Sequence, residues 1–209
     1  MSSPKISDQR ARILASTRAL FGQNGYAGTT TRQILAAAGV ANGALYHAFE
    51  NGKPEIAGAL YEQAARALRD ALSEKKAPKI ASEYPKPEAL IKSLVGVFFT
   101  WREGHQDLAG FMAEMEACPP EDPARPVINS ARKALHDLLW DICMPIIGRP
   151  ALNRLPAPLL EATILGPAKC AMQAWGPIMS TGTIRPNALV SALAAAAAAS
   201  MTAVSRQLK

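Results

Sequence analysis

Residues 30–49 read TTRQILAAAGVANGALYHAF, and this stretch decides the fold. Thr30 and Gln33 predict a capping box at the start of a helix, because the Thr hydroxyl accepts a backbone N–H while the Gln side chain reaches back to the cap. Gly39 predicts the end of that helix, because glycine adopts the left-handed conformation that other residues resist. A second short helix follows, so the stretch predicts a helix-turn-helix.

The second helix of this stretch has one apolar face and one polar face. Val40, Leu45 and Phe49 predict its buried side. Tyr46 and His47 then lie outside, with tips that can form hydrogen bonds. Since a helix-turn-helix lays its second helix in the major groove of DNA, these two side chains are candidates for reading DNA. The alternative is that Tyr46 packs at a helix edge and that His47 is a solvated histidine.

The segment before this stretch predicts a first helix of the same domain. Residues 12–21 are amphipathic, with Ser7 as the expected N-cap and Gly25 as the expected stop. Residues 1–53 contain six basic and two acidic side chains, whereas the net charge of all 209 residues is only +6. Six minus two gives +4 of the total +6, so most of the net charge lies in about a quarter of the chain, as a phosphate-binding surface requires.

Residues 10–60 resemble the N-terminal domain of the TetR family of bacterial transcriptional regulators. The resemblance rests on a long ordered series of residues: Arg10, Ile13, Leu14, Phe21, Gly25, Tyr26, Thr29, Thr30, Ile34, Ala38, Gly39, Val40, Gly43, Leu45, Tyr46, His47 and Phe49. It implies a homodimer that binds a near-palindromic operator in double-stranded DNA, with one recognition helix per half-site. It also implies a C-terminal domain that holds a small, often apolar ligand, whose binding releases the operator. Most members of the family are repressors.

The expected DNA-contacting residues follow from the motif and from this resemblance. They are Thr30, Thr31, Arg32, Ala41, Asn42, Gly43, Ala44, Tyr46, His47 and Lys53. Ala41 stands where the family usually has Ser, which removes a cap of about 1 kcal/mol, and Asn42 is expected to replace that cap. The family often has Lys at the position of Asn42 and Thr at that of Ala44, so this reading face is sparse. Lys53 is the expected phosphate contact, after an apparent one-residue insertion.

The rest of the chain predicts helices separated by Pro- and Gly-rich breaks, without a convincing strand pattern. We therefore expect an all-α protein. Residues 1–53 form a three-helix, helix-turn-helix DNA-binding domain with its motif at about 30–49, and residues 54–209 form a C-terminal helical ligand-binding and dimerisation domain. The expected C-terminal helices span residues 54–76, 88–103, 106–117, 127–147, 159–175 with a kink at Pro167, and 187–207.

The last two of these helices are the expected dimer interface. Helix 159–175 is apolar all round, and such a helix must be buried on several sides. The segment between Arg185 and Arg206 has no charge over twenty residues, which approaches the length of a membrane span. Its dominant residue is Ala, which is only weakly apolar, so close helix packing between two copies is favoured and no membrane partner is expected.

The middle helices carry many Met and aromatic residues, which adapt well to an apolar guest. The candidate ligand-binding residues are Phe98, Trp101, His105, Met112, Met115, Trp140, Met144, Met172, Gln173 and Trp175. His136 and Lys169 are further polar groups that can orient a ligand. For each residue alone, packing in the core is the alternative. As a set they favour a small apolar or aromatic effector.

Several other functional classes find no support in the sequence. It contains no nucleophile elbow, phosphate loop or metal-ligand cluster, so we expect neither an enzyme nor a cofactor or metal. Cys118, Cys143 and Cys170 are widely spaced and indicate neither a zinc site nor a disulfide framework. The first seven residues lack the apolar core of a secretion signal, so a cytoplasmic location is expected. The alternative function is a TetR-like DNA-binding protein controlled by a protein partner or by cysteine redox state, without a small-molecule inducer.

Overall fold

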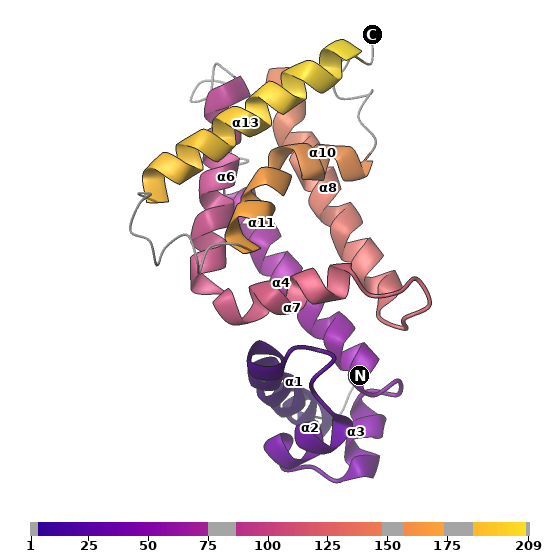
Figure 1. Cartoon of the computed structure of the whole chain (residues 1–209). Helices are drawn as coiled ribbons and strands as arrows, with labels where there is room; N and C mark the ends of the chain where they lie inside the picture. Colours follow the sequence, from indigo (N-terminus) through magenta and orange to yellow (C-terminus); the bar gives the residue numbers. More distant parts are fainter. Residues whose placement is uncertain (1–3, 75–86, 148–156, 174–185, 208–209) are drawn as a thin grey trace. The chain divides into compact units, whose positions relative to one another are not determined.

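The computed structural model describes residues 4–74, 87–147, 157–173 and 186–207, and these form helices and turns without a strand (Figure 1). The expected all-α fold is therefore confirmed. In chain order the helices are α1 (Pro4–Asn24), α2 (Thr31–Ala38), α3 (Asn42–Ala48), α4 (Lys53–Ser73), α6 (Pro87–Gly104), α7 (Gln106–Glu116), α8 (Arg125–Ile147), α10 (Ala157–Ile164), α11 (Gly166–Gln173) and α13 (Pro186–Gln207).

The chain forms two compact units. The first comprises Met1–Arg66 with His105–Arg132, and the second comprises Ala67–Gly104 with Lys133–Lys209. The first unit therefore contains α1, α2, α3, α7, most of α4 and the start of α8. The sequence-based division at residue 53 concerns function and stays a prediction, whereas by packing α7 belongs with the N-terminal helices.

The first unit is built around α1, which contacts α2, α3 and α7 (Figure 1). Its core includes the large buried side chains of Ile13, Phe21, Ile34, Leu45, Phe49, Ile56, Leu60, Tyr61, Phe111, Met115 and Ile128. Helix α1 begins at Pro4, which suits the first helical position because the N–H that proline lacks would have no partner there. The expected N-cap at Ser7 is therefore wrong. Gly25 does end the helix, with φ 71° and its N–H 3.0 Å from the Phe21 carbonyl oxygen.

The second unit is built around α13, which packs across α6 and also contacts α10 and α11 (Figure 1). Its core includes Leu90, Leu94, Phe98, Leu139, Ile142, Leu160, Ile164, Ala168, Ala194, Ala197 and Met201. The expected kinked helix 159–175 is two helices, α10 and α11, which meet at Leu165. Pro167 explains the break, because it has no N–H to continue the helical hydrogen bonds.

Four predicted features lie wholly or almost wholly outside the described residues. They are the loops predicted at 77–87 and 148–158, the turn predicted at 176–186, and Trp175.

Candidate nucleic-acid interface

The start of α2 is fixed by its own side chains. Thr30 is the N-cap, and its hydroxyl accepts the Gln33 N–H at 3.3 Å while the Gln33 side-chain oxygen accepts the Thr30 N–H at 2.7 Å. Gly39 closes the helix at φ 62° and ψ 41°, in the left-handed region. Both features of the sequence motif are confirmed, and they set where α2 starts and where the turn leads into α3.

Helix α3 is anchored by its apolar face. Leu45 and Phe49 are fully buried, and Ala48 is nearly so. Its N-cap is Ala41, which has extended backbone angles of φ −74° and ψ 156° but no capping side-chain bond. The expectation that Asn42 takes over the cap is wrong, because Asn42 is already the first helical residue. The position of α3 therefore depends on packing rather than on a cap.

The predicted DNA-contacting residues lie mostly at the surface of the first unit. The exposed ones are Thr30, Arg32, Ala41, Asn42, Gly43, Tyr46 and His47, and the half-buried ones are Thr31, Ala44 and Lys53. Tyr46 is 44% exposed. One edge of its ring covers Gly52, where a Cβ would lie 3.1 Å from Tyr46 Cε1. Tyr46 therefore packs over Gly52 and is at the same time partly exposed to solvent.

Two basic side chains of the first unit, Arg10 and Lys53, have partners within it. Arg10 lies over the Phe49 ring, 4.0 Å from its centroid, donates to the Ala48 carbonyl oxygen, and is 3.6 Å from the Glu55 carboxylate. Lys53 donates to the Tyr26 and Thr29 carbonyl oxygens at 2.9 and 2.8 Å. Each thus ties a helix to a loop or to a helix end.

Helix α7 completes this unit, and its packing against the N-terminal helices was not predicted from the sequence. Glu114 accepts the backbone N–H groups of Tyr26 and Ala27 at 2.6 and 2.8 Å. Asp107 accepts two bonds from the Arg18 guanidinium at 2.7 and 3.2 Å. These acidic residues follow each other at helical spacing, but nothing in that spacing identifies partners some 88 residues away.

The candidate ligand residues are divided between the two units. His105, Met112 and Met115 belong to the first, whereas Phe98, Trp101, Trp140 and Met144 belong to the second. Phe98 and Trp101 are buried with their ring centroids 6.1 Å apart. Met172 and Gln173 lie on α11, and nothing is described of their side chains. A single ligand site formed by the whole set stays a prediction.

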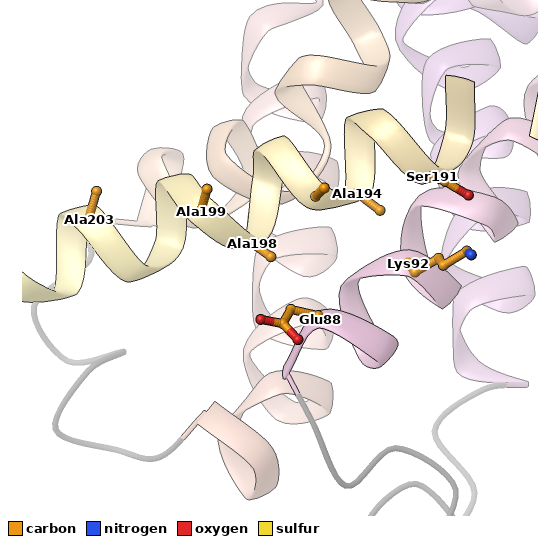
Figure 2. A pocket seen from close by; sticks show the side chains of 8 residues that line it. Glu88, Lys92, Ser191, Ala194, Ala198, Ala199 and Ala203 are labelled. Atoms are coloured by element: carbon orange, nitrogen blue, oxygen red, sulfur yellow. The ribbon is translucent and has the colours of Figure 1, made fainter. Parts of the chain in front are cut away.

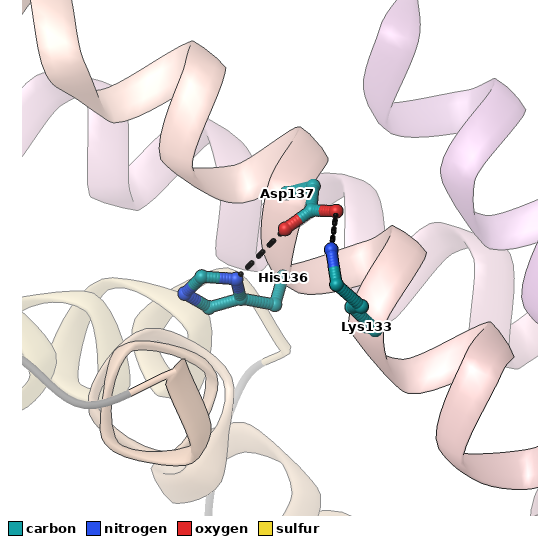
Figure 3. Close-up of polar contacts among 3 residues, drawn as sticks. All are labelled: Lys133, His136 and Asp137. Atoms are coloured by element: carbon teal, nitrogen blue, oxygen red, sulfur yellow. Dashed lines mark hydrogen bonds and ion pairs between the residues drawn. The ribbon is translucent and has the colours of Figure 1, made fainter.

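A polar cluster lies on α8 within the second unit (Figure 3). Asp137 accepts the Lys133 ammonium at 2.6 Å, and its other oxygen is 3.3 Å from His136 Nδ1. The hydrogen bond from Lys133, and to a smaller extent the one from His136, lowers the pKa of Asp137. Nε2 of His136 is buried and has no hydrogen-bond partner within the described part of the chain. Trp140 lies one helical turn further along α8, and the centroids of the His136 and Trp140 rings are 6.2 Å apart.

An open groove of about 610 Å³ runs between α6 and α13 (Figure 2). One wall carries Glu88 and Lys92, and the other is formed by Ser191 and a row of alanines that includes Ala194, Ala195 and Ala199. None of the predicted ligand residues lines it. Its wall is small and weakly apolar, which suits a packed helix better than an aromatic guest.

Other kinds of site are not found among the described residues. No described group of three or more His, Cys, Asp or Glu side chains has the arrangement of a metal site. In the same residues, no helix is long and apolar enough to cross a membrane.

Glu161 and Lys169 form a largely buried ion pair at 2.6 Å between α10 and α11. Burial raises the pKa of the Cys143 thiol to about 12, whereas Cys170 is exposed.

The N-terminal part of the chain is similar in sequence to known bacterial regulatory proteins. Residues 13–60 match the family model of bacterial regulatory proteins, tetR family. The uncharacterized HTH-type transcriptional regulator YxaF of Bacillus subtilis (strain 168) is 44% identical over 50 residues, which are 24% of this chain and 26% of that protein. The chain thus matches about a quarter of the length of this curated relative.

Solved structures extend the similarity of fold to nearly the whole chain. The fatty acid degradation regulator FadR from Bacillus halodurans has a TM-score of 0.66 at 21% identity, over 95% of this chain and 96% of that one. FadR from Bacillus subtilis, in complex with stearoyl-CoA, has a TM-score of 0.62 at 20% identity over the same shares. At these identities the likeness shows a common fold.

Proposed function

The chain belongs to the TetR family of bacterial regulatory proteins, and from this membership we propose that it is a repressor that binds operator DNA as a homodimer. Helix α3 is the proposed recognition helix, one per half-site of a near-palindromic operator. A small apolar or aromatic ligand in the second unit releases the operator. The protein is proposed to act in the cytoplasm and to have no enzymatic activity.

The observation that carries the DNA-binding role is the exposed face of α3. The capping box of Thr30 and Gln33, the left-handed Gly39 and the buried Leu45 hold this face in place. Tyr46 and His47 lie on it, both exposed. A helix with a fixed back and polar groups in front is what insertion into the major groove requires.

The sparse side chains on this face suggest how specificity is divided. Asn42 can form bidentate hydrogen bonds with adenine, whereas Gly43 and Ala44 allow close approach of the backbone. Phosphate contacts are proposed for Thr30, Thr31, Arg32 and Lys53, because they flank the helix pair and carry donors. Few base contacts imply that the shape of the operator contributes to its selection.

The proposed homodimer uses the apolar helices α10, α11 and α13. Ala195, Ala196 and Ala199 are exposed on α13, and small residues allow two helices to approach closely. The groove between α6 and α13 lies beside them (Figure 2). Two copies related by a two-fold axis would bury these alanines against each other.

The proposed effector is apolar, and an acyl chain is the class to test first. The B. subtilis FadR whose fold this chain shares was solved with stearoyl-CoA. Within the second unit, His136, Trp140 and Met144 follow each other at intervals of four residues on α8, and all three are half-buried. Such a stripe offers an aromatic and thioether wall with one imidazole, which suits a lipid-like or aromatic guest.

The DNA-binding role is tested by selection from random duplexes. The protein should enrich a near-palindromic sequence, and Tyr46→Ala should weaken binding to it while the melting temperature stays close to that of the wild type. Tyr46→Phe separates the roles of the ring and the hydroxyl, because the ring still covers Gly52 while the hydrogen bond is lost. We expect a loss of roughly tenfold for Tyr46→Phe, the value of one good base contact. Failure to enrich any sequence would refute operator binding.

The effector is tested by thermal shift and by operator release. Stearoyl-CoA should raise the melting temperature and dissociate the selected duplex, whereas coenzyme A without the acyl chain should do neither. Trp140→Ala should reduce both effects without changing DNA affinity in the absence of ligand. A melting temperature that acyl-CoA, free fatty acids and aromatic compounds all leave unchanged would favour the alternative function.

That alternative is control by a protein partner or by redox state, and Cys170 is the cysteine that supports it. It is exposed, whereas the high pKa of the buried Cys143 thiol makes that sulfur unreactive. Burial also raises the pKa of Cys118. Oxidant-sensitive operator binding that is abolished by Cys170→Ser would establish redox control.

A further inference from the structure

The turn from Gly25 to Thr30, which joins α1 to α2, is bound on one side by a carboxylate from α7. Glu114 accepts the N–H groups of Tyr26 at 2.6 Å and of Ala27 at 2.8 Å. Gly25 has φ 71°, and a Cβ at this position would lie 2.9 Å from a Glu114 oxygen. Successive N–H groups beside a left-handed residue form a concavity that binds anions, and here the anion is a side chain of the same protein.

The other side of the same turn is bound by a cation from α4. Lys53 donates to the carbonyl oxygens of Tyr26 and Thr29. Thr29 is itself 1% exposed, and its hydroxyl donates to the Gly25 carbonyl oxygen at 2.8 Å. The polar groups of the turn are therefore bound by one acidic and one basic side chain, from helices that follow it in the sequence.

Helix α7 is itself packed against α1, so the position from which Glu114 reaches the turn is fixed. The Phe111 ring stacks on Phe21, with centroids 5.0 Å apart and planes at 15°. One turn before it, Asp107 forms its two hydrogen bonds with Arg18. Asp107, Phe111 and Glu114 are spaced by four and three residues, which places them on one face of the helix.

We propose that Glu114 is a positioning residue for operator reading, which fixes the Gly25–Thr30 turn and thereby the direction of α2 and α3. The turn ends at Thr30, the N-cap of α2, so a displacement of Tyr26 or Ala27 is passed directly to the helix-turn-helix. Glu114 acts through this turn and does not itself contact DNA. The inference rests on the proposed function, because it concerns how the reading helices are held.

When the Glu114 carboxylate is neutralised, its electrostatic role and its positioning role predict changes of opposite sign in the affinity for operator DNA. The first unit binds a polyanion, so loss of a negative charge by itself strengthens binding to every duplex. Loss of the two hydrogen bonds loosens the turn and weakens binding only to the sequence that α3 reads. The sign of the change in operator affinity therefore separates the two effects.

The experiment compares Glu114→Gln and Glu114→Ala with Glu116→Gln as a matched control. Glu116 is two residues further on α7, and it accepts the Tyr61 hydroxyl at 3.0 Å, away from the turn. The probes are the duplex that the wild-type protein enriches from a random library and a scrambled duplex of equal length. Binding is measured well below each melting temperature, as a function of salt.

We expect Glu114→Gln to bind the enriched duplex roughly three- to tenfold more weakly, because its single amide oxygen can replace only part of the two bonds. Glu114→Ala should lose more, and Glu116→Gln should bind at least as well as the wild type. The salt slope should stay near that of the wild type, and the affinity for the scrambled duplex should equal or exceed that of the wild type, because only the loss of a negative charge acts on it. In amide hydrogen exchange, Tyr26 and Ala27 should exchange faster in both Glu114 variants.

Wild-type or tighter operator binding by Glu114→Gln would overturn the inference, as would a loss equal to that of Glu116→Gln. If Glu114→Ala does not fold, the Gln variant, its salt slope and its amide exchange still decide the question. Failure of the wild-type protein to enrich any duplex refutes instead the proposed function, which is a separate result.

Discussion

The ammonium of Lys53 lies 4.3 Å from the centroid of the Tyr26 ring and donates to the Tyr26 carbonyl oxygen. A second bond goes to the carbonyl oxygen of Thr29, so two of its three donors hold the turn before α2. Burial lowers the pKa of Lys53, against the opposing effect of the carboxylates of Glu114 and Asp122. Any phosphate contact by this residue is therefore made by a side chain that also anchors the helix-turn-helix.

Replacing Lys53 by Ala should have two separable effects. The free energy of unfolding should fall by about 1–3 kcal/mol, because two bonds from a charged donor are lost. The dependence of log K on log salt should become less steep by roughly one, as the loss of one phosphate contact requires. Urea unfolding and salt titration of duplex binding measure the two effects.

Lys92→Ala is the matched control for Lys53, because this lysine is exposed on α6 of the second unit. Lys92→Ala should change neither the free energy of unfolding nor the salt dependence of duplex binding. An unchanged salt slope in Lys53→Ala would remove Lys53 from the DNA contacts, and unchanged stability would show that the turn does not depend on it.

Restoring a cap at the start of α3 should stabilise the protein. Ala41 already has the extended backbone of an N-cap, so the hydroxyl of Ala41→Ser can accept an N–H of the first turn without rearrangement. We expect a gain of about 0.5–1 kcal/mol in the free energy of unfolding. Ala41→Val adds bulk without an acceptor and is the control, and equal stability of the two variants would contradict the capping explanation.

The features of the fold that the sequence predicted depend on neighbouring residues. Thr30, Gln33 and Gly39 define α2 through contacts within one helical turn, and prolines mark most breaks between helices. The limits of α6, α7 and α13 differ from the prediction by only one residue. Ser7 resembles an N-cap but lies inside α1, because the helix starts earlier at Pro4.

The parts of the site that the sequence did not predict depend on residues far apart in the chain. Arg10 looks like an ordinary surface charge, yet it lies on the Phe49 ring. Glu114 and its partner Tyr26 are 88 residues apart, and no periodicity relates them. The ligand residues stay a prediction for another reason: Met and aromatic side chains suit a core and a pocket equally. Phe98 and Trp101 are buried, which fits either role.

The Arg18–Asp107 pair should contribute to stability in a defined pH range. The hydrogen bond from Arg18 lowers the pKa of Asp107 below its ordinary value of 3.8, against the opposing effect of burial. A carboxylate with a depressed pKa in the folded state stabilises the protein above its ordinary pKa, and this contribution is lost as the pH falls through the folded value. Because both side chains are about 40% exposed, we expect only about 0.2–1 kcal/mol.

Urea unfolding between about pH 2 and pH 6 tests this contribution, since the range spans the ordinary and the depressed pKa. The difference in unfolding free energy between wild type and Asp107→Asn should be largest above about pH 4 and should shrink below it. Asp8→Asn, at an exposed position of α1, is the control. If the difference in unfolding free energy between wild type and Asp107→Asn stays constant as the pH falls, the pair does not stabilise the folded state in the way proposed.

Two adjacent alanines of α13 separate dimerisation from folding. Ala197 is fully buried within the second unit, whereas Ala196 is exposed. Ala197→Glu should therefore unfold or strongly destabilise the unit, because it buries an unpaired charge. Ala196→Glu should keep the helical circular dichroism and the melting profile of a folded protein, yet weaken the proposed dimer, since two like charges would meet near the two-fold axis. Sedimentation equilibrium measures the dissociation constant, with Ala36→Glu on the exposed side of α2 as the matched substitution outside the interface. A dimer of Ala196→Glu as tight as the wild type would place the interface away from this face of α13, because a glutamate at its centre could not be accommodated without loss.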